Sequence, residues 1–148
     1  MKIDDALRNV SKLFLDTSPA IYYIQANTKY IDRVQIIFDR LDAGDFQAIT
    51  SPVTLAEALI LPFHTNQSLL LQSFRNLIVH GTNTTLVAIN QSIAEQAAEL
   101  RVRYNLQLMD AFQVGVALDT ACDAFLTNDA TLRRVTEIKV IMIDDLEL

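Results

Sequence analysis

The chain has 148 residues, a formal net charge of −6 and a hydrophobic fraction of 51%. This length suits a single domain, and the acidic balance argues against the basic surface that most nucleic-acid-binding proteins carry. No apolar run approaches the roughly 18–20 residues of a membrane helix, and the N-terminal residues do not resemble a secretory signal. The single cysteine, Cys122, excludes an internal disulfide and a cysteine zinc site. Together these features favour a cytoplasmic protein.

The glycines and histidines of the chain exclude several kinds of site. Gly44, Gly81 and Gly115 lie far apart, so the sequence offers no glycine-rich loop to bind a phosphate group. His64 and His80 are isolated, and no serine lies in a nucleophile motif. Acid–base or metal chemistry would therefore depend on carboxylates.

The first twelve residues precede the first strand-like run. Ile3, Ala6, Leu7 and Val10 are spaced for one or two amphipathic helical turns, and disorder is the alternative. We therefore treat residues 1–12 as an N-terminal extension and residues 13–148 as the folded domain.

The first half of this domain alternates strand-like and helix-like patterns. Residues 13–16 predict a strand, and Ser18 followed by Pro19 predicts that a helix begins there. The next helical pattern ends at Gly44, a residue type that favours a helix C-cap. A second strand is expected at residues 47–51.

The second half continues the alternation. One helical pattern ends at Gly81, a capping box from Ser92 to Glu95 predicts another helix, and a further helix is expected to begin at Asp110. Short apolar runs predict three more strands, at residues 84–89, 124–127 and 139–143.

Short, continuously apolar strands between amphipathic helices are typical of a parallel sheet covered on both faces. We therefore predict an α/β fold, a three-layer α/β/α sandwich around a short, mainly parallel sheet. In such sheets, ligands bind outside the carboxyl ends of the strands.

Two acidic residues follow the first two strands. Asp16 ends the first strand, and the expected cap at Ser18 does not need its carboxylate. Glu57 has two interpretations. It either forms a capping box with Thr54 or, if the helix begins at Ser51, lies a turn and a half inside that helix.

Two more acids belong to the second half of the chain. Asp110 begins the predicted helix that follows an apolar segment, and Asp129 follows the strand at residues 124–127. For each of them, taken alone, a helix N-cap is the favoured interpretation, since Asp is a common capping residue.

The four acids together carry more information than each one alone. All four could face one edge of the sheet, where like charges repel and raise pKa values. A hard divalent cation such as Mg²⁺ or Mn²⁺ would relieve this conflict, because these ions prefer oxygen ligands. Such a site can orient a phosphodiester, activate water and stabilise the leaving oxygen in an in-line displacement.

The order and spacing of five segments closely resemble PIN domains, particularly the VapC-type toxins of bacterial toxin–antitoxin modules. Each motif is weak alone, but their order is specific, and the resemblance extends from Leu13 to the C-terminus. The segments are LFLDTS (13–18), SPVTLAEAL (51–59), LQLMDAFQVGVAL (106–118), AFLTNDATLRRV (124–135) and KVIMIDDL (139–146).

The resemblance implies an acidic quartet that binds Mg²⁺ or Mn²⁺, with Asp16 and Asp110 as the expected direct ligands. Ser18 and Thr127 would be supporting hydroxyls that orient carboxylates or waters. The implied activity is metal-dependent endoribonuclease cleavage of RNA, restrained by a cognate antitoxin protein, and a homodimer is expected. The quartet consists of Asp16, Glu57, Asp110 and Asp129.

Two alternatives come from other classes of protein. A PIN-like module that binds RNA or a protein without cutting would have no reason to keep four mutually repelling acids. A receiver or phosphatase domain, which handles phosphate on an aspartate, requires a lysine after the last strands or an Asp-x-Asp motif after the first. The chain lacks both features.

Overall fold

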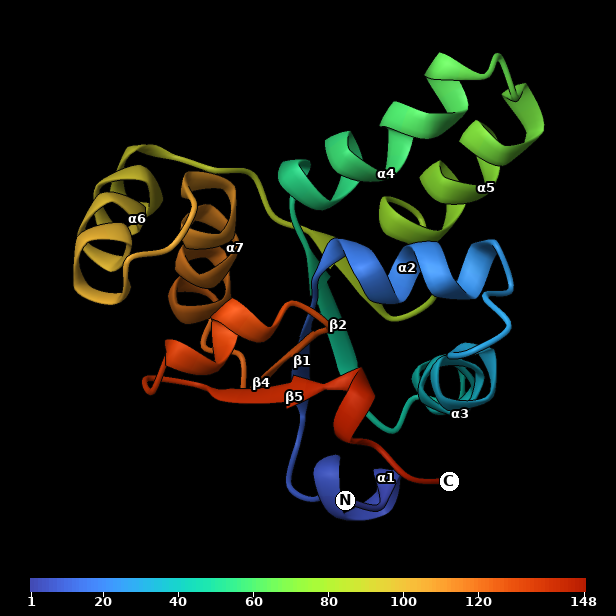
Figure 1. Ribbon diagram of the computed structural model, residues 1–148, viewed down its shortest axis with the longest axis horizontal. Helices are drawn as coiled ribbons and strands as arrows, with labels where there is room; N and C mark the ends of the chain where they lie inside the picture. The colour runs from blue at the N-terminus through green and yellow to red at the C-terminus, as the bar shows by residue number, and fades with distance from the viewer.

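A five-stranded sheet forms the centre of the computed structural model, which describes residues 1–148 (Figure 1). The strand order is β3-β2-β1-β4-β5, and every pairing is parallel. The predicted strands are confirmed to within one residue at each end, except that β3 is three residues shorter. The strands are β1 Lys12–Leu15, β2 Gln47–Thr50, β3 Thr84–Leu86, β4 Ala124–Thr127 and β5 Lys139–Met142.

Helices cover both faces of this sheet, which confirms the predicted α/β/α sandwich (Figure 1). In Figure 1, α6 and α7 lie together on one side of the strands, whereas α2 and α3 lie on the other. The α-helices are α1 Ile3–Ala6, α2 Thr17–Ile24, α3 Ile31–Asp42, α4 Pro52–His64, α5 Ser68–Ile78, α6 Gln91–Tyr104 and α7 Leu108–Asp119. Two short 3₁₀ helices, Ala130–Arg134 and Ile143–Asp145, flank β5.

Alternate residues of the strands pack into two separate hydrophobic cores, one on each face of the sheet. Leu13 and Leu15 of β1 pack with the apolar face of α3, while Phe14 packs with α6 and α7. Phe14 also stacks on Phe125 of β4, with ring centroids 4.9 Å apart. Because both faces are buried, the strands need apolar residues throughout, which explains the continuous apolar runs.

Two glycines mark helix ends in different ways. Gly44 follows α3 with a φ of 85°, and its N–H donates to the carbonyl of Leu41 at 3.0 Å. The next N–H, from Asp45, donates to Arg40 O at 3.0 Å, which completes a Schellman motif. Gly81 does not adopt a positive φ; a Cβ there would lie 2.3 Å from Leu77 O, so its lack of a side chain permits a close backbone approach.

Three predicted helix starts are wrong. α2 begins at Thr17 rather than at Pro19, so Asp16 instead of Ser18 occupies the N-cap position, although its side chain makes no capping bond. The N-cap of α6 is Asn90, whose side-chain oxygen accepts from the backbone N–H of Ile93 at 2.9 Å. The predicted capping box from Ser92 to Glu95 therefore does not form. α7 begins two residues before Asp110.

The predicted start of α4 at Ser51 is confirmed. The Ser51 hydroxyl accepts from the backbone N–H groups of Val53 and Thr54 at 3.1 and 3.4 Å, and Pro52 is the first helical residue. Glu57 therefore lies well inside the helix, and its capping-box interpretation is wrong.

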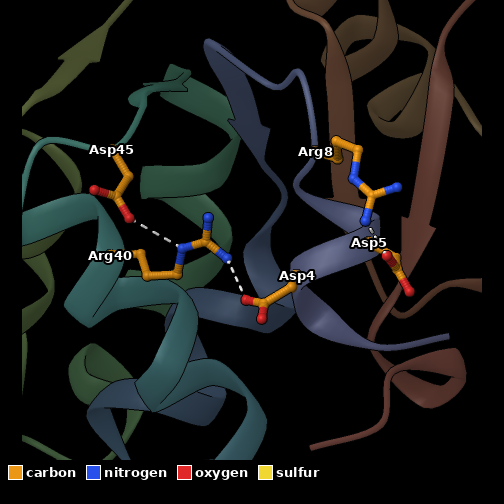
Figure 2. A network of polar contacts seen from close by, with 5 residues as sticks. All are labelled: Asp4, Asp5, Arg8, Arg40 and Asp45. Atoms are coloured by element: carbon orange, nitrogen blue, oxygen red, sulfur yellow. Dashed lines mark hydrogen bonds and ion pairs between the residues drawn. The ribbon is translucent and has the colours of Figure 1, made fainter.

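The N-terminal segment is tied to the domain. Four of its apolar residues, Ile3, Ala6, Leu7 and Val10, are buried in the same core as α3. Figure 2 shows Arg40 of α3 between two carboxylates, with Asp4 of α1 at 3.0 Å and Asp45 at 3.1 Å. The backbone N–H of Glu147 also donates to Met1 O at 2.7 Å. No helix is both long and apolar enough to cross a membrane.

Candidate functional site

The site lies at the point where the order of the strands reverses. β1 is flanked by β2 on one side and β4 on the other, and the carboxyl ends of parallel strands at such a point leave a crevice for ligands. A hollow of about 420 Å³ opens there. It brings together all four predicted acids with four further residues: Asp16, Thr17, Ser18, Glu57, Asp110, Asn128, Asp129 and Ala130.

Asp16 is the buried acid of the group, with 7% of its surface exposed. The Thr127 hydroxyl donates to its Oδ2 at 2.7 Å, and Gln113 Nε2 approaches its Oδ1 at 3.4 Å. Burial raises the pKa of the Asp16 carboxyl above its ordinary value, while these hydrogen bonds oppose the increase. The carboxylate is therefore held at both oxygens from below the hollow.

Glu57 reaches the same hollow from the second turn of α4. The hydroxyl of Thr17, the first residue of α2, donates to Glu57 Oε1 at 2.7 Å. Thr17 thus links the helix after β1 to the acid supplied by α4. Sequence reasoning assigned a supporting hydroxyl to Ser18 and missed Thr17, because both residues with hydroxyl side chains follow Asp16.

Asp110 has the clearest electrostatic signature of the four. It is the third residue of α7 and is half-buried. Burial, followed by repulsion from Asp16 and Asp129, raises the pKa of its carboxyl to about 7. Near neutral pH the surroundings of Asp110 therefore favour a proton or a cation at its carboxylate.

Asp129 both caps a helix and lines the site. Its Oδ1 accepts from the backbone N–H of Thr131 at 3.0 Å and from the Thr131 hydroxyl at 2.9 Å, which caps the 3₁₀ helix after β4. Both bonds use Oδ1, so the cap does not occupy Oδ2. The two interpretations of this residue are therefore compatible.

The two predicted supporting hydroxyls make different contacts. Thr127 donates to Asp16 and also accepts from the backbone N–H of Asp129 at 3.1 Å, so it connects two of the acids. Ser18 makes no hydrogen bond to a carboxylate; its hydroxyl accepts from the backbone N–H of Asn128 at 3.1 Å and holds the loop after β4.

The donor set is suited to a hard divalent cation. The side chains that line the hollow offer only oxygen ligands apart from the amide nitrogen of Asn128, and a cation would offset the repulsion that contributes to the raised pKa of Asp110. No three acidic, histidine or cysteine side chains converge into a finished metal-binding group. An ion that retains several waters, as Mg²⁺ does, requires only one or two carboxylates.

The chain is similar to known proteins in family and in fold. The family model for the PIN domain matches residues 13–138. Curated proteins give no match. The fold is similar to that of VapBC2 from Rickettsia felis, which was solved with a DNA fragment from its promoter. The TM-score is 0.70 at 15% identity, and the match covers 88% of this chain and 98% of the VapBC2 chain.

Two further solved structures have the same architecture. VapC20 from Mycobacterium tuberculosis, a toxin that cleaves the sarcin–ricin loop, has a TM-score of 0.68 at 17% identity and covers 86% of this chain and 98% of its own. A toxin–antitoxin complex from Klebsiella pneumoniae gives 0.65 at 22% identity, with coverages of 90% and 98%. At these identities the likeness shows a shared fold.

Proposed function

The chain belongs to the PIN domain family, and on this premise we propose that it is a divalent-metal-dependent endoribonuclease that hydrolyses RNA phosphodiester bonds. One observation carries the proposal. Four carboxylates from four separate segments line a single open hollow at the carboxyl ends of β1 and β4. Such a concentration of like charge costs stability, which a bound cation would recover.

The side chains can be assigned roles on this basis. Asp16 and Asp110 would hold the cation, and Glu57 and Asp129 would complete the acidic site. A bound Mg²⁺ or Mn²⁺ supplies Lewis-acid polarisation of a phosphodiester and a more acidic water for in-line displacement. Thr127 keeps Asp16 oriented toward the hollow, as its 2.7 Å hydrogen bond indicates.

The first prediction is that purified protein cuts total RNA with Mg²⁺ or Mn²⁺ and stops when EDTA is added. Asp16→Asn should abolish cutting, because it removes a buried ligand charge while keeping the shape of the side chain. Asp119→Asn, which changes an exposed acid at the end of α7, is the matched control and should cut normally. Cleavage that persists in EDTA, or full activity of Asp16→Asn, would contradict the mechanism.

We also propose that the protein is the toxin of a type II toxin–antitoxin pair and acts as a homodimer with a cognate antitoxin. The fold shared with VapC toxins supports this assignment. Because unrestrained RNA cleavage stops growth, the partner is expected to present a basic or amphipathic segment to the acidic hollow.

The second prediction tests the toxin assignment in cells. Expression of this chain alone should slow growth, and Asp110→Asn at equal protein level should not, because it removes a proposed metal ligand. Growth curves with matched immunoblots check this. Equal growth inhibition by both proteins would favour a PIN-like module that binds RNA or a protein without cutting.

A further inference from the structure

Most of the polar side chains that the fold buries belong to one network beneath the hollow. Six polar or charged residues are buried, and only Thr50 lies outside this network, with its hydroxyl on Ile78 O. The other five are connected by hydrogen bonds: Asp16, Ser51, Thr54, Gln113 and Thr127. No buried side-chain polar atom lacks a partner.

Gln113 is the centre of this network. It lies one helical turn beyond Asp110 on α7 and is 1% exposed. Its Oε1 accepts from the Ser51 hydroxyl, and its Nε2 donates to Thr54 Oγ1 at 2.7 Å and approaches Asp16 Oδ1 at 3.4 Å. One amide therefore joins α7, the start of α4 and the end of β1.

The neighbours of the amide fix its orientation. Ser51 Oγ already accepts from two backbone N–H groups as the N-cap of α4, so its own proton is available for Gln113 Oε1. The Thr54 hydroxyl donates to Leu15 O at 3.1 Å, so it must accept from Gln113. The NH₂ group consequently always faces Asp16 as a donor.

This arrangement determines how Asp16 can be placed. Thr127 donates to Oδ2 and Gln113 approaches Oδ1, so rotation of the carboxylate would disturb its hydrogen bonds to two donors that are themselves fully buried. Donors that hold a ligand carboxylate in this way typically affect metal affinity or activity by 10–100-fold.

We infer that Gln113 is a positioning residue that fixes the Asp16 carboxylate relative to Asp110 and to the α4 helix that carries Glu57. The inference rests on the proposed function, because it concerns the same acidic site. Gln113 is 1% exposed and does not line the hollow. Its loss should therefore change metal affinity and kcat, and leave the KM for RNA nearly unchanged.

The test compares Gln113→Met with Val114→Ala. Methionine keeps the length of the side chain but donates no hydrogen bond to Asp16. Val114, the next residue of α7, is equally buried but belongs only to the apolar core, so its variant controls for lost stability. Thr54→Val, of nearly unchanged shape, is the second variant if Gln113→Met does not fold, since it removes the hydroxyl that anchors the amide.

Three measurements give the outcome: Mn²⁺ affinity by electron paramagnetic resonance, kcat and KM for RNA, and ¹⁵N spectra of the metal-free protein. We expect Gln113→Met to lose about 10–100-fold in Mn²⁺ affinity or kcat, with Val114→Ala near wild type. The Gln113 side-chain NH₂ signals should be protected from exchange and should shift in Asp16→Asn. Gln113→Met that matches Val114→Ala overturns the inference while cleavage by the wild type sustains the proposed function.

The proposed function can fail separately. A wild-type protein that binds Mn²⁺ but cuts no RNA refutes the nuclease, and weaker Mn²⁺ binding by Gln113→Met then still supports the positioning role. A wild-type protein that binds no Mn²⁺ overturns both.

Discussion

At the scale of single residues, Asp129 combines two tasks on one carboxylate. Its Oδ1 accepts two hydrogen bonds from Thr131, while the side chain lines the hollow that it shares with Asp110. These tasks respond differently to substitution. Asn and Asp cap about equally well, so Asp129→Asn should keep the cap, whereas Asp129→Ala should lose about 0.5–2 kcal/mol of stability.

The third prediction concerns the response of these variants to Mg²⁺. The wild type should be stabilised by RT ln(1 + [L]/Kd), about 2.7 kcal/mol at one hundred times Kd, and both Asp129 variants noticeably less. In EDTA, Asp129→Asn should be at least as stable as the wild type, because it removes one of four repelling charges. Melting curves with EDTA and with excess Mg²⁺ provide the measurement. If all three proteins gain the same stability from Mg²⁺, Asp129 acts only as a cap.

Asp110 gives a fourth prediction, on pH. The pKa of its carboxyl is about 7 in the folded protein and near 3.8 when unfolded, so the folded state holds the proton more tightly across this window. The free energy of unfolding therefore falls as pH rises from about 4 to about 7. Above that range the loss of stability due to Asp110 stays constant. Asp110→Asn removes this contribution.

Urea unfolding in EDTA at about pH 5 and about pH 8 checks the sign. The stability advantage of Asp110→Asn over the wild type should be larger at the higher pH. For Asp119→Asn on the same helix, the difference in stability from the wild type should not increase with pH. An advantage that shrinks with rising pH would mean that Asp110 is not the group that charge repulsion destabilises.

At the scale of elements, the sequence was sufficient to predict the strands because burial on both faces leaves a continuous apolar run. Helix boundaries were harder. Asn90 and Ser92 are both good capping residues, and only the path of the chain after β3 decides that Asn90 takes the position. Similarly, Asp16 follows β1 so closely that it enters the N-cap position of α2, while its carboxylate turns toward Thr127.

The site was predictable in part for the same reason. Asp16 follows β1 directly and Asp129 lies two residues after β4, so a parallel sheet brings them to one edge. Gln113 was missed, because a single polar residue in the apolar pattern around Val114 does not reveal which partners the fold will bring to it. Its position between Phe112 and Val114 was the available signal, and its contacts with Ser51 and Thr54 exist only in three dimensions.

At the scale of the whole molecule, the N-terminal segment behaves as part of the domain core. The family model begins at residue 13, yet α1 packs on the same apolar cluster as α3 and β1. Backbone bonds also join the two ends of the chain, since Ile3 N–H donates to Glu147 O at 3.3 Å and Glu147 N–H donates to Met1 O at 2.7 Å. The segment therefore contributes to the core that α3 and β1 share.

The fifth prediction measures how much this closure contributes. Leu7 is 4% exposed within the core, so Leu7→Ala should lower the free energy of unfolding by about 2–5 kcal/mol, through lost burial and the cavity left behind. Leu69, which is 86% exposed on α5, is the matched control, and its change to alanine should stay within about 0.5 kcal/mol. Urea unfolding monitored by circular dichroism gives both values. RNA cleavage measured well below the melting temperature should be unchanged in both variants, since neither residue lines the hollow. If Leu7→Ala unfolds at the same urea concentration as the wild type, residues 1–12 are a dispensable extension, and the stability of the domain resides in residues 13–148.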